Sequence, residues 1–356
     1  MRLVSLSEVL PGEPVTNADM AARFGLHERW LDAMTGNRTR YFCRPDGPPG
    51  VPRSTSDLAT AAGEQALLRS GLDPASLDFV ILTTASPDHL MPATVNLVAD
   101  RLGLNDIPTF QLTSGCAGAL QGLYTARALL AAGELRRGLV IGADTCRNLW
   151  PSDGAIAQLR PAEMVSFALF GDGAGAAVVD AGTDGPGLVV EHLFTRTVGK
   201  GRSPAQIVRW YGAEGAPMVS GPRGEPVREA MSDEDYKAIE QHVPEAARAI
   251  LDELVAVTGW PADEVEHLLI PQLNGVMTEK IRRYLGVRPE QAVSCVADTG
   301  NNGNALPFIQ LNRAMRRIAA GTGVGGRLLV TTVESSKWVL TGMALRHRPE
   351  EADDVR

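Results

Sequence analysis

The sequence lacks any apolar run long enough to span a membrane. Its first residues, Met1 to Leu6, are followed by polar residues, proline and glycine, so we expect neither a secretory signal nor a transit peptide. Positive charge is not in excess either, since the net charge is −8, and this argues against bulk nucleic-acid binding. These absences predict a cytoplasmic protein with no membrane and no nucleic-acid partner.

Cysteine is also scarce, with four residues in a chain of 356. The four are scattered, without C-x-x-C pairs or Cys/His pairs at zinc spacing, so neither a disulfide framework nor a structural metal is expected. The composition, 44% hydrophobic and 21% charged, is ordinary for a globular protein. The length is sufficient for two core-forming units.

The most informative cysteine is Cys116. It follows an apolar stretch, residues 109–112, and lies in the run Thr-Ser-Gly-Cys-Ala-Gly-Ala that opens an expected helix over residues 117–132. A thiol at a helix N-terminus feels the positive end of the helix dipole and unpaired N–H groups, which stabilise the thiolate. The pattern predicts a nucleophile, although an isolated cysteine is more often a small buried hydrophobe.

An internal duplication organises the chain. Residues 77–86 resemble residues 265–274, and residues 137–145 resemble residues 326–334. Apolar strands alternate with helices in both halves, which predicts an α/β fold with mixed sheets covered on both faces. We place the halves at residues 1–182 and 183–356, and we expect the helices at residues 56–69, 117–132, 244–258 and 305–319.

The duplication also predicts where a site would form. The counterpart of the Cys116 turn is residues 298–306, which carry Asn301 and Asn302. Pseudo-symmetric turns face each other, so an asparagine and the cysteine would meet at one buried centre. The alternative is that this Asn/Gly cluster is simply a turn.

At these motifs the chain resembles the thiolase superfamily, and within it β-ketoacyl-acyl-carrier-protein synthase III (KAS III) and its acyltransferase relatives. The resemblance covers nearly the whole chain and rests on residues 15–19, 30–40, 113–119 and, most specifically, the run Phe-Gly-Asp-Gly-Ala-Gly-Ala-Ala-Val at 170–178. It implies a five-layered αβαβα thiolase fold, a homodimer and an acyl-enzyme thioester on Cys116. The glycines of 170–178 then serve close backbone packing beside the site and bind no phosphate.

The chain departs from the family where the second half-reaction is catalysed. The family carries Pro-His-Gln at this strand end, and here the run is Pro-Gln-Leu, so the histidine is replaced by Gln272. A glutamine amide still donates a hydrogen bond beside Asn301 but cannot exchange a proton. Alignment of the two halves slightly prefers Asn302 as the residue that faces the thiol.

A second departure replaces the family's glycine-rich loop by Val-Glu-Ser-Ser-Lys-Trp at 333–338. The duplication places Glu334 opposite Asp144, where it would supply a base, although a surface or salt-bridged carboxylate is the simpler interpretation. His89, in a loop that resembles the one near the acyl pocket and dimer interface, is an auxiliary candidate, and the alternative is an ordinary loop histidine.

The resemblance also implies how a donor would bind. Trp30 matches a tryptophan that stacks on the adenine of coenzyme A, but Met34 stands where the family has an arginine. Lys280, Arg282 and Arg283 resemble a docking surface for acidic carrier proteins, with a solvated basic helix face as the alternative. The expected substrate is therefore an acyl-carrier-protein or acyl-CoA thioester, with no permanently bound cofactor.

Three hypotheses for function follow. In the first, the protein is an acyltransferase of specialised metabolism that passes an acyl group from Cys116 to an amine or alcohol. In the second, it is a KAS III-like enzyme that forms a carbon–carbon bond with an already acidic carbon, in a non-standard Claisen condensation. In the third, it is a non-catalytic partner subunit of a synthase. Loss of the histidine harms malonyl decarboxylation most directly, which favours the first hypothesis.

Overall fold

The computed structural model describes residues 1–44, 47–150, 156, 159–209, 217–220, 224–228, 232–321 and 326–349. The strands and helices of the first half are β1 (Arg2–Val9), β2 (Val15–Thr16), α1 (Asn17–Phe24), α2 (Glu28–Thr35), β3 (Thr39–Arg40), α3 (Thr55–Ser70), β4 (Phe79–Thr84), α4 (Thr94–Arg101), β5 (Thr109–Thr113), α5 (Gly118–Ala131), β6 (Arg137–Asp144), α6 (Pro161–Leu169) and β7 (Gly173–Asp180). Those of the second half are β8 (Gly187–Thr197), β9 (Gln206–Val208), β10 (Met218–Ser220), β11 (Pro226–Arg228), β12 (Ser232–Glu234), α7 (Tyr236–Thr258), β13 (His267–Leu269), α8 (Gly275–Leu285), α9 (Val296–Thr299), α10 (Leu306–Ala319), β14 (Arg327–Glu334) and β15 (Val339–Arg348). The expected boundary between the halves falls in the turn that joins β7 to β8.

Nine of the described strands run in the hydrogen-bonded order β13-β14-β15-β8-β1-β7-β6-β4-β5. Two residue pairs, Arg2 with Val189 and Leu3 with Leu188, join β1 to β8, so the order divides there into two sheets. Parallel pairs recur in both halves, β4 with β5 and β6 in the first and β13 with β14 in the second. The duplication predicted from sequence is therefore visible in the strand topology.

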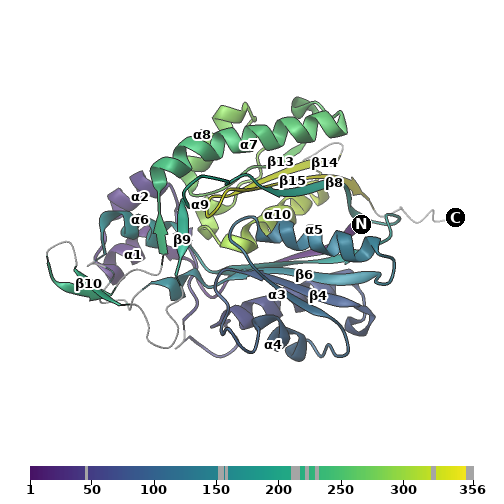
Figure 1. Cartoon of the computed structure of the whole chain (residues 1–356), viewed down its shortest axis with the longest axis horizontal. Helices are drawn as coiled ribbons and strands as arrows, with labels where there is room; N and C mark the ends of the chain where they lie inside the picture. Colours follow the sequence, from purple (N-terminus) through teal and green to yellow (C-terminus); the bar gives the residue numbers. More distant parts are fainter. Residues whose placement is uncertain are drawn as a thin grey trace.

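Helices lie on both faces of each sheet (Figure 1). α3 and α4 cover the first sheet, α7 and α8 cover the second, and α5 and α10 fill the layer between them. This is the five-layered αβαβα arrangement expected of a thiolase fold. No helix in the described ranges combines the length and apolarity needed to cross a membrane.

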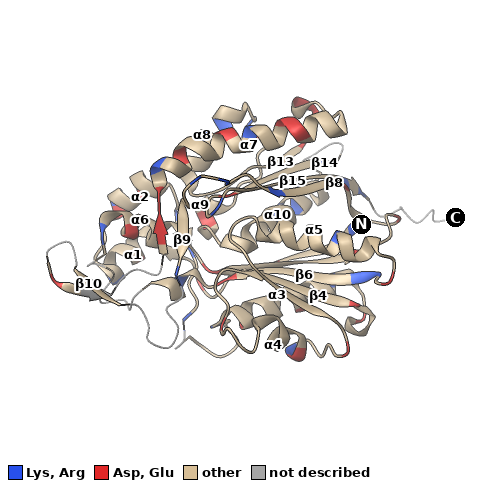
Figure 2. Cartoon of the chain, in the orientation of Figure 1, with Lys and Arg blue, Asp and Glu red and all other residues tan. Residues whose placement is uncertain are grey.

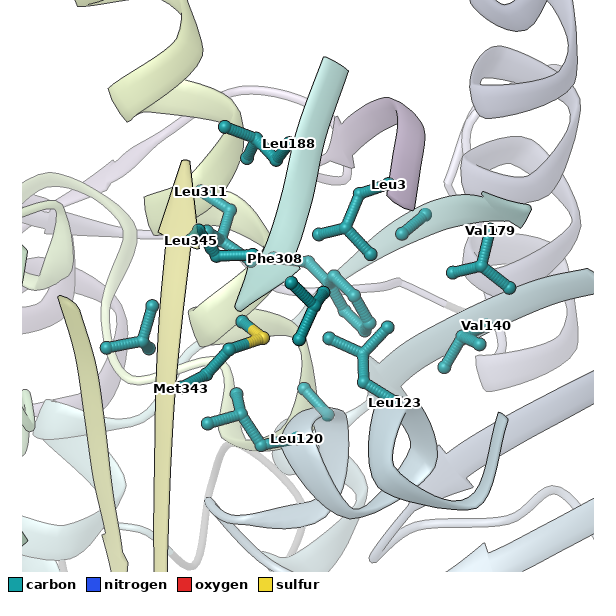
Figure 3. Close-up of a cluster of buried hydrophobic side chains, with 14 of the residues drawn as sticks. Leu3, Leu120, Leu123, Val140, Val179, Leu188, Phe308, Leu311, Met343 and Leu345 are labelled. Carbon is teal, nitrogen blue, oxygen red and sulfur yellow. The ribbon is translucent and has the colours of Figure 1, made fainter. Parts of the chain in front are cut away.

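The core between the sheets is built by both halves. Figure 3 shows Leu120 and Leu123 of α5 and Phe308 and Leu311 of α10 packing together with side chains from both sheets, and all of these residues are buried. Burying such side chains contributes about 1.5–3 kcal/mol each. The two helices whose N-termini meet at the candidate site are thus fixed by the largest cluster of the molecule.

Glycines in the 170–178 run permit close packing, as the sequence predicted. A Cβ on Gly171 would lie 2.5 Å from the Thr299 carbonyl oxygen, and one on Gly175 would lie 2.5 Å from the Phe308 Cβ. Neither position has room for a side chain. The run therefore brings the loop before α10 against the first sheet.

Two elements differ from the sequence prediction. The helix expected at 244–258 begins eight residues earlier, at Tyr236, because Asp235 caps it by accepting a hydrogen bond from the Ala238 amide and Pro244 is tolerated inside it. The strand expected over 265–274 is short, spanning only His267–Leu269. Pro271 follows it and has no N–H to continue the ladder.

Candidate active site

Cys116 lies in the turn between β5 and α5, two residues before the helix begins. The turn is packed tightly because a Cβ on Gly118 would lie 1.7 Å from the Asn304 Oδ1. Cys116 lines a cavity of about 540 Å³. The nucleophile position predicted from sequence is therefore a thiol at a helix N-terminus that faces a cavity of substrate size.

Two carboxylates from equivalent strand ends share this cavity with the thiol. Asp144 ends β6 and Glu334 ends β14, and both line the cavity. The position of Glu334 opposite Asp144, predicted from the duplication, is confirmed. Other lining residues come from the loop after β4, from β9 and from the loop after β14: Ser86, Asp88, Leu90, Gln206, Val208 and Ser336.

Glu334 is held against the cysteine turn. Its Oε2 accepts hydrogen bonds from the Gly115 amide at 3.0 Å and from the Ser114 hydroxyl at 2.8 Å, and its Oε1 accepts one from the Ser336 hydroxyl. The side chain is buried, with 7% of its surface exposed. The simpler interpretation, a surface or salt-bridged carboxylate, is therefore wrong for this residue.

Asp144 is the centre of a buried polar network. Its Oδ1 accepts hydrogen bonds from Thr84, Ala85 and Ser86, and its Oδ2 accepts two from Asn304. Burial nevertheless raises the pKa of the Asp144 carboxyl, because these bonds offset the loss of solvation only in part.

Asn304 ties this network to the cysteine turn. Besides its bonds to Asp144, its Nδ2 donates to the Ser114 carbonyl oxygen at 2.7 Å. An asparagine of the 298–306 turn does reach the cysteine turn, but it is Asn304 and not Asn301 or Asn302. The sequence pattern favours Asn301 because that residue fits the family motif. The sequence feature that points to Asn304 is its place directly before the expected helix at 305–319, which the duplication pairs with the helix that follows Cys116.

The thiol is protonated at rest, contrary to the expectation of a stabilised thiolate. Burial, together with the negative charges of Glu334, Glu234 and Asp144, raises the pKa of Cys116 to about 12. The helix dipole supplies only partial charge at this distance, and desolvation with neighbouring carboxylates outweighs it. The neutral thiol is therefore favoured near pH 7, so the attack on a donor requires a proton acceptor.

A second cavity of about 530 Å³, the Trp30 cavity, lies beside the first and contains two of the residues predicted to bind the donor, Trp30 and Lys280. Met34 and Asn301 also line it, and Cys116 is not among its described lining residues. A thin wall separates the two cavities. In each of three segments, residues that are adjacent or two apart line opposite sides: Leu169 and Phe170, Glu234 and Ser232, and Asn301 and Gly303.

Comparison with known proteins places this geometry in a family. The model of 3-oxoacyl-[acyl-carrier-protein] synthase III matches residues 110–197, which include the cysteine turn and β7. The β-ketoacyl-[acyl-carrier-protein] synthase III 3 of Streptomyces coelicolor is 32% identical over 344 residues, 92% of either chain. The chain belongs to the β-ketoacyl-[acyl-carrier-protein] synthase III family. A KAS III of Neisseria meningitidis serogroup B is 28% identical over 308 residues, 86% of this chain and 88% of that protein.

Solved structures agree with the assignment to the KAS III family. AbyA1, described as a tetronic acid condensing enzyme, is 40% identical, with 97% of this chain and 99% of that chain covered and a TM-score of 0.86. The FabH of Pseudomonas aeruginosa is 25% identical, with 99% of each chain covered and a TM-score of 0.79. The thiolase fold and the KAS III-like nature of the chain are thus established from both sequence and structure.

Gln272, which the sequence pattern was expected to set in place of the KAS III histidine, does not line the Cys116 cavity in the described part of the chain. Its Nε2 donates to the Val293 carbonyl oxygen at 2.8 Å, and its Oε1 accepts from the Cys295 and Val296 amides at 2.9 Å each. The side chain is buried and bonded to the main chain before α9. The structure therefore assigns Gln272 a structural place, and its expected hydrogen bond to a thioester oxygen finds no support.

The two asparagines predicted to face the thiol are also placed elsewhere. The Asn301 Oδ1 accepts from the Gly303 amide at 3.1 Å, and its side chain lines the Trp30 cavity. The Asn302 Nδ2 donates to the Asp172 and Thr299 carbonyl oxygens. The expected meeting of Asn301 or Asn302 with Cys116 is thus not observed. The wall between the two cavities lies between Asn301 and the thiol, and the side chain of Asn302 is hydrogen-bonded to the main chain.

The remaining candidates divide between the cavities and the surface. His89 is exposed and outside the described lining of the Cys116 cavity, although its neighbours Asp88 and Leu90 do line it. Arg282 and Arg283 both pair with Glu279, and Lys280 pairs with Glu240. Figure 2 shows acidic and basic residues interspersed along α7 and α8. The basic helix face expected to dock a carrier protein is therefore largely compensated by its own acidic neighbours.

Proposed function

We propose that this protein is a KAS III-like condensing enzyme that loads an acyl group onto Cys116 and transfers it to an acceptor carbon that is already acidic, without decarboxylation. The observation that carries this proposal is the position of Gln272. The family's proton-exchanging histidine is absent, and the amide in its place is bonded to the main chain of residues 293–296. Neither Gln272 nor Asn301 is among the described lining residues of the Cys116 cavity, which supports an acceptor that needs no decarboxylation.

Electrostatics supports the same choice. The Cys116 cavity is lined by the carboxyl groups of Asp88, Asp144 and Glu334, and the one cation among its described lining residues, Arg209, lies 3.7 Å from the Asp233 carboxylate. A malonyl carboxylate entering it would meet an excess of negative charge, and like charges at close range in a poorly solvated cavity repel. A β-ketoacyl thioester carries no carboxylate, and its carbon between two carbonyl groups is acidic enough for a carboxylate base to deprotonate. A neutral acceptor of this kind suits the cavity better than malonyl.

The relative described as a tetronic acid condensing enzyme fits this chemistry, at 40% identity. A tetronic acid is a five-membered ring lactone of a γ-hydroxy-β-keto acid, and assembling it from two acyl units requires one carbon–carbon and one carbon–oxygen bond. We propose a β-ketoacyl thioester as the acceptor of this protein. We infer a role in specialised metabolism, with a homodimer as the working form and an acyl-carrier-protein or acyl-CoA thioester as the donor.

Acyl transfer to an alcohol or amine is the second candidate, and the position of Glu334 favours it too. A carboxylate beside the thiol serves a hydroxyl acceptor as well as an acidic carbon. The two candidates share the acyl-enzyme and differ only in the nucleophile that discharges it.

Intact-protein mass spectrometry tests the proposal. The wild type and Cys116→Ala are incubated with acetyl to octanoyl donors on carrier protein, coenzyme A and N-acetylcysteamine, and then with malonyl-carrier protein, acetoacetyl-N-acetylcysteamine, butan-1-ol or butylamine. We expect a Cys116-dependent acyl adduct that acetoacetyl-N-acetylcysteamine discharges and malonyl-carrier protein does not. Discharge by malonyl with release of carbon dioxide would refute the proposal, and no adduct with any donor would favour a non-catalytic partner subunit.

A further inference from the structure

Glu334 is a carboxylate with three hydrogen-bond donors and no cation. The Gly115 amide, the Ser114 hydroxyl and the Ser336 hydroxyl all donate to it. Within the described ranges no lysine or arginine forms an ion pair with Glu334. Because a carboxylate accepts about four hydrogen bonds, one acceptor position remains available.

The other carboxylates near Cys116 are less suitable as bases. Asp144 already accepts five hydrogen bonds, which leaves no free acceptor position. Glu234 accepts from Ser166 and Gln206 and lines the Trp30 cavity on the other side of the wall. Asp88 lines the Cys116 cavity, but it accepts from the Thr55 and Ser56 amides and, within the described ranges, forms no hydrogen bond with the cysteine turn. Of these four carboxylates, Glu334 alone combines a hydrogen bond from the cysteine turn, a place in the Cys116 cavity and spare acceptor capacity.

We propose that Glu334 is a catalytic residue, the general base that deprotonates the acceptor substrate and then returns that proton to Cys116. This inference rests on the proposed function and deepens it by naming the group that replaces the missing histidine. It also explains why the glycine-rich loop of the family is interrupted by a glutamate at this strand end.

The step balances without any further reactant. The Glu334 carboxylate takes a proton from the carbon between the two carbonyl groups of the acceptor, and the resulting carbanion attacks the acyl carbon of the Cys116 thioester. The tetrahedral intermediate collapses with breakage of the carbon–sulfur bond, and the thiolate leaves. Protonated Glu334 then gives its proton to the Cys116 sulfur, which restores both groups. No group is oxidised or reduced.

The decisive experiment starts from preformed acyl-enzyme. The experiment compares the wild type, Glu334→Gln and the surface control Glu191→Gln. The control removes a carboxylate of β8 that pairs with Arg346. All three proteins are loaded with acetyl-N-acetylcysteamine and freed of excess donor. Discharge by acetoacetyl-N-acetylcysteamine is followed by intact mass. We expect Glu334→Gln to discharge about 100-fold or more slowly, the lower range for loss of a general base, and the control to match the wild type. A Glu334→Gln rate equal to that of the wild type overturns the inference.

Alkylation by iodoacetamide separates loss of a base from damage to the turn. Glu334 is one of the negative charges that raise the Cys116 pKa, so its neutralisation increases the thiolate fraction. We expect Glu334→Gln to be alkylated faster than the wild type at the same pH while it discharges more slowly. Slower alkylation together with slower discharge would show a distorted turn and would count against the inference.

The outcomes for the two proposals are distinguishable. If the wild-type acyl-enzyme is discharged only by butan-1-ol or butylamine, the proposed carbon–carbon bond formation fails. The ratio of wild-type to Glu334→Gln rates on that acceptor then tests Glu334 on its own.

Discussion

Gln272→Met is the substitution that separates a structural from a catalytic role at the position of the missing histidine. Methionine has a similar length and no hydrogen-bonding amide. It would leave the Cys295 and Val296 amides, both buried, without the acceptor that now lies 2.9 Å from each. The Val293 carbonyl oxygen keeps its bond from the Gln310 Nε2. The perturbation is therefore two unsatisfied buried N–H groups.

The magnitude follows from those two groups. An unsatisfied buried donor costs about 1–3 kcal/mol, so we expect a loss of about 3 kcal/mol in the free energy of unfolding. An unfolding entropy of about 2.1 cal/mol/K per residue amounts to about 0.75 kcal/mol/K for a chain of this length, which corresponds to a fall in Tm of about 4 °C.

The assay pairs thermal unfolding with acyl transfer. We expect Gln272→Met to melt earlier than the wild type, while the acyl-enzyme at Cys116 forms and discharges at the wild-type rate well below the Tm. An unchanged Tm with a slower discharge of the acyl-enzyme would refute the reasoning, because it would mean that the Gln272 amide faces the substrate and does not hold the main chain before α9.

Two further predictions concern other buried groups. Asn304→Ala removes the donor to the Ser114 carbonyl oxygen, so we expect acylation of Cys116 to slow by roughly 10- to 100-fold as the turn loses its position. The matched control is Asn312→Ala, which removes a buried asparagine bonded to Arg69. Equal acylation rates in both variants would contradict the role of Asn304 in positioning the cysteine turn. His267 is buried and neither of its ring nitrogens has a hydrogen-bond partner among the described residues, and burial lowers its pKa from the ordinary 6.5. The unfolded chain then binds a proton that the folded chain does not, so this histidine lowers stability as the pH falls below 6.5, and His267→Leu is expected to raise the Tm and to flatten that fall. A Tm that falls equally in both proteins between pH 7 and pH 5 would exclude His267 as the cause.

The sequence was a good guide where local pattern decides the structure. The Cys116 turn follows from an apolar strand, small residues and a helix, and all of these are neighbours in sequence. The pairing of Asp144 with Glu334 across one cavity follows from the duplication, which fixes equivalent strand ends. Both features required only order along the chain and the symmetry of the two halves.

The predictions failed where the direction of a single side chain decides the outcome. Gln272 bonds to an amide run more than twenty residues later, and nothing in its own neighbourhood indicates that partner. Asn301, Asn302 and Asn304 are the same residue type within one short turn, so the sequence does not distinguish them. Only the fold determines which of them reaches the Ser114 carbonyl oxygen. The thiolate expected at Cys116 was wrong for the same reason, because the burial that raises the pKa of the thiol, and the carboxylates that add to it, come from segments distant in sequence.

The place of β1 has a consequence for how the chain is made. This strand lies between β7 and β8, at the junction of the two sheets, and its residues pair with Asp180 and Val189. β1 precedes both of these strands in the chain, so it is completed by strands that are translated much later. Until β7 and β8 have been translated, the apolar residues of β1 have no partner strand. Pairing of β1 in the nascent chain therefore depends on prompt elongation through β8.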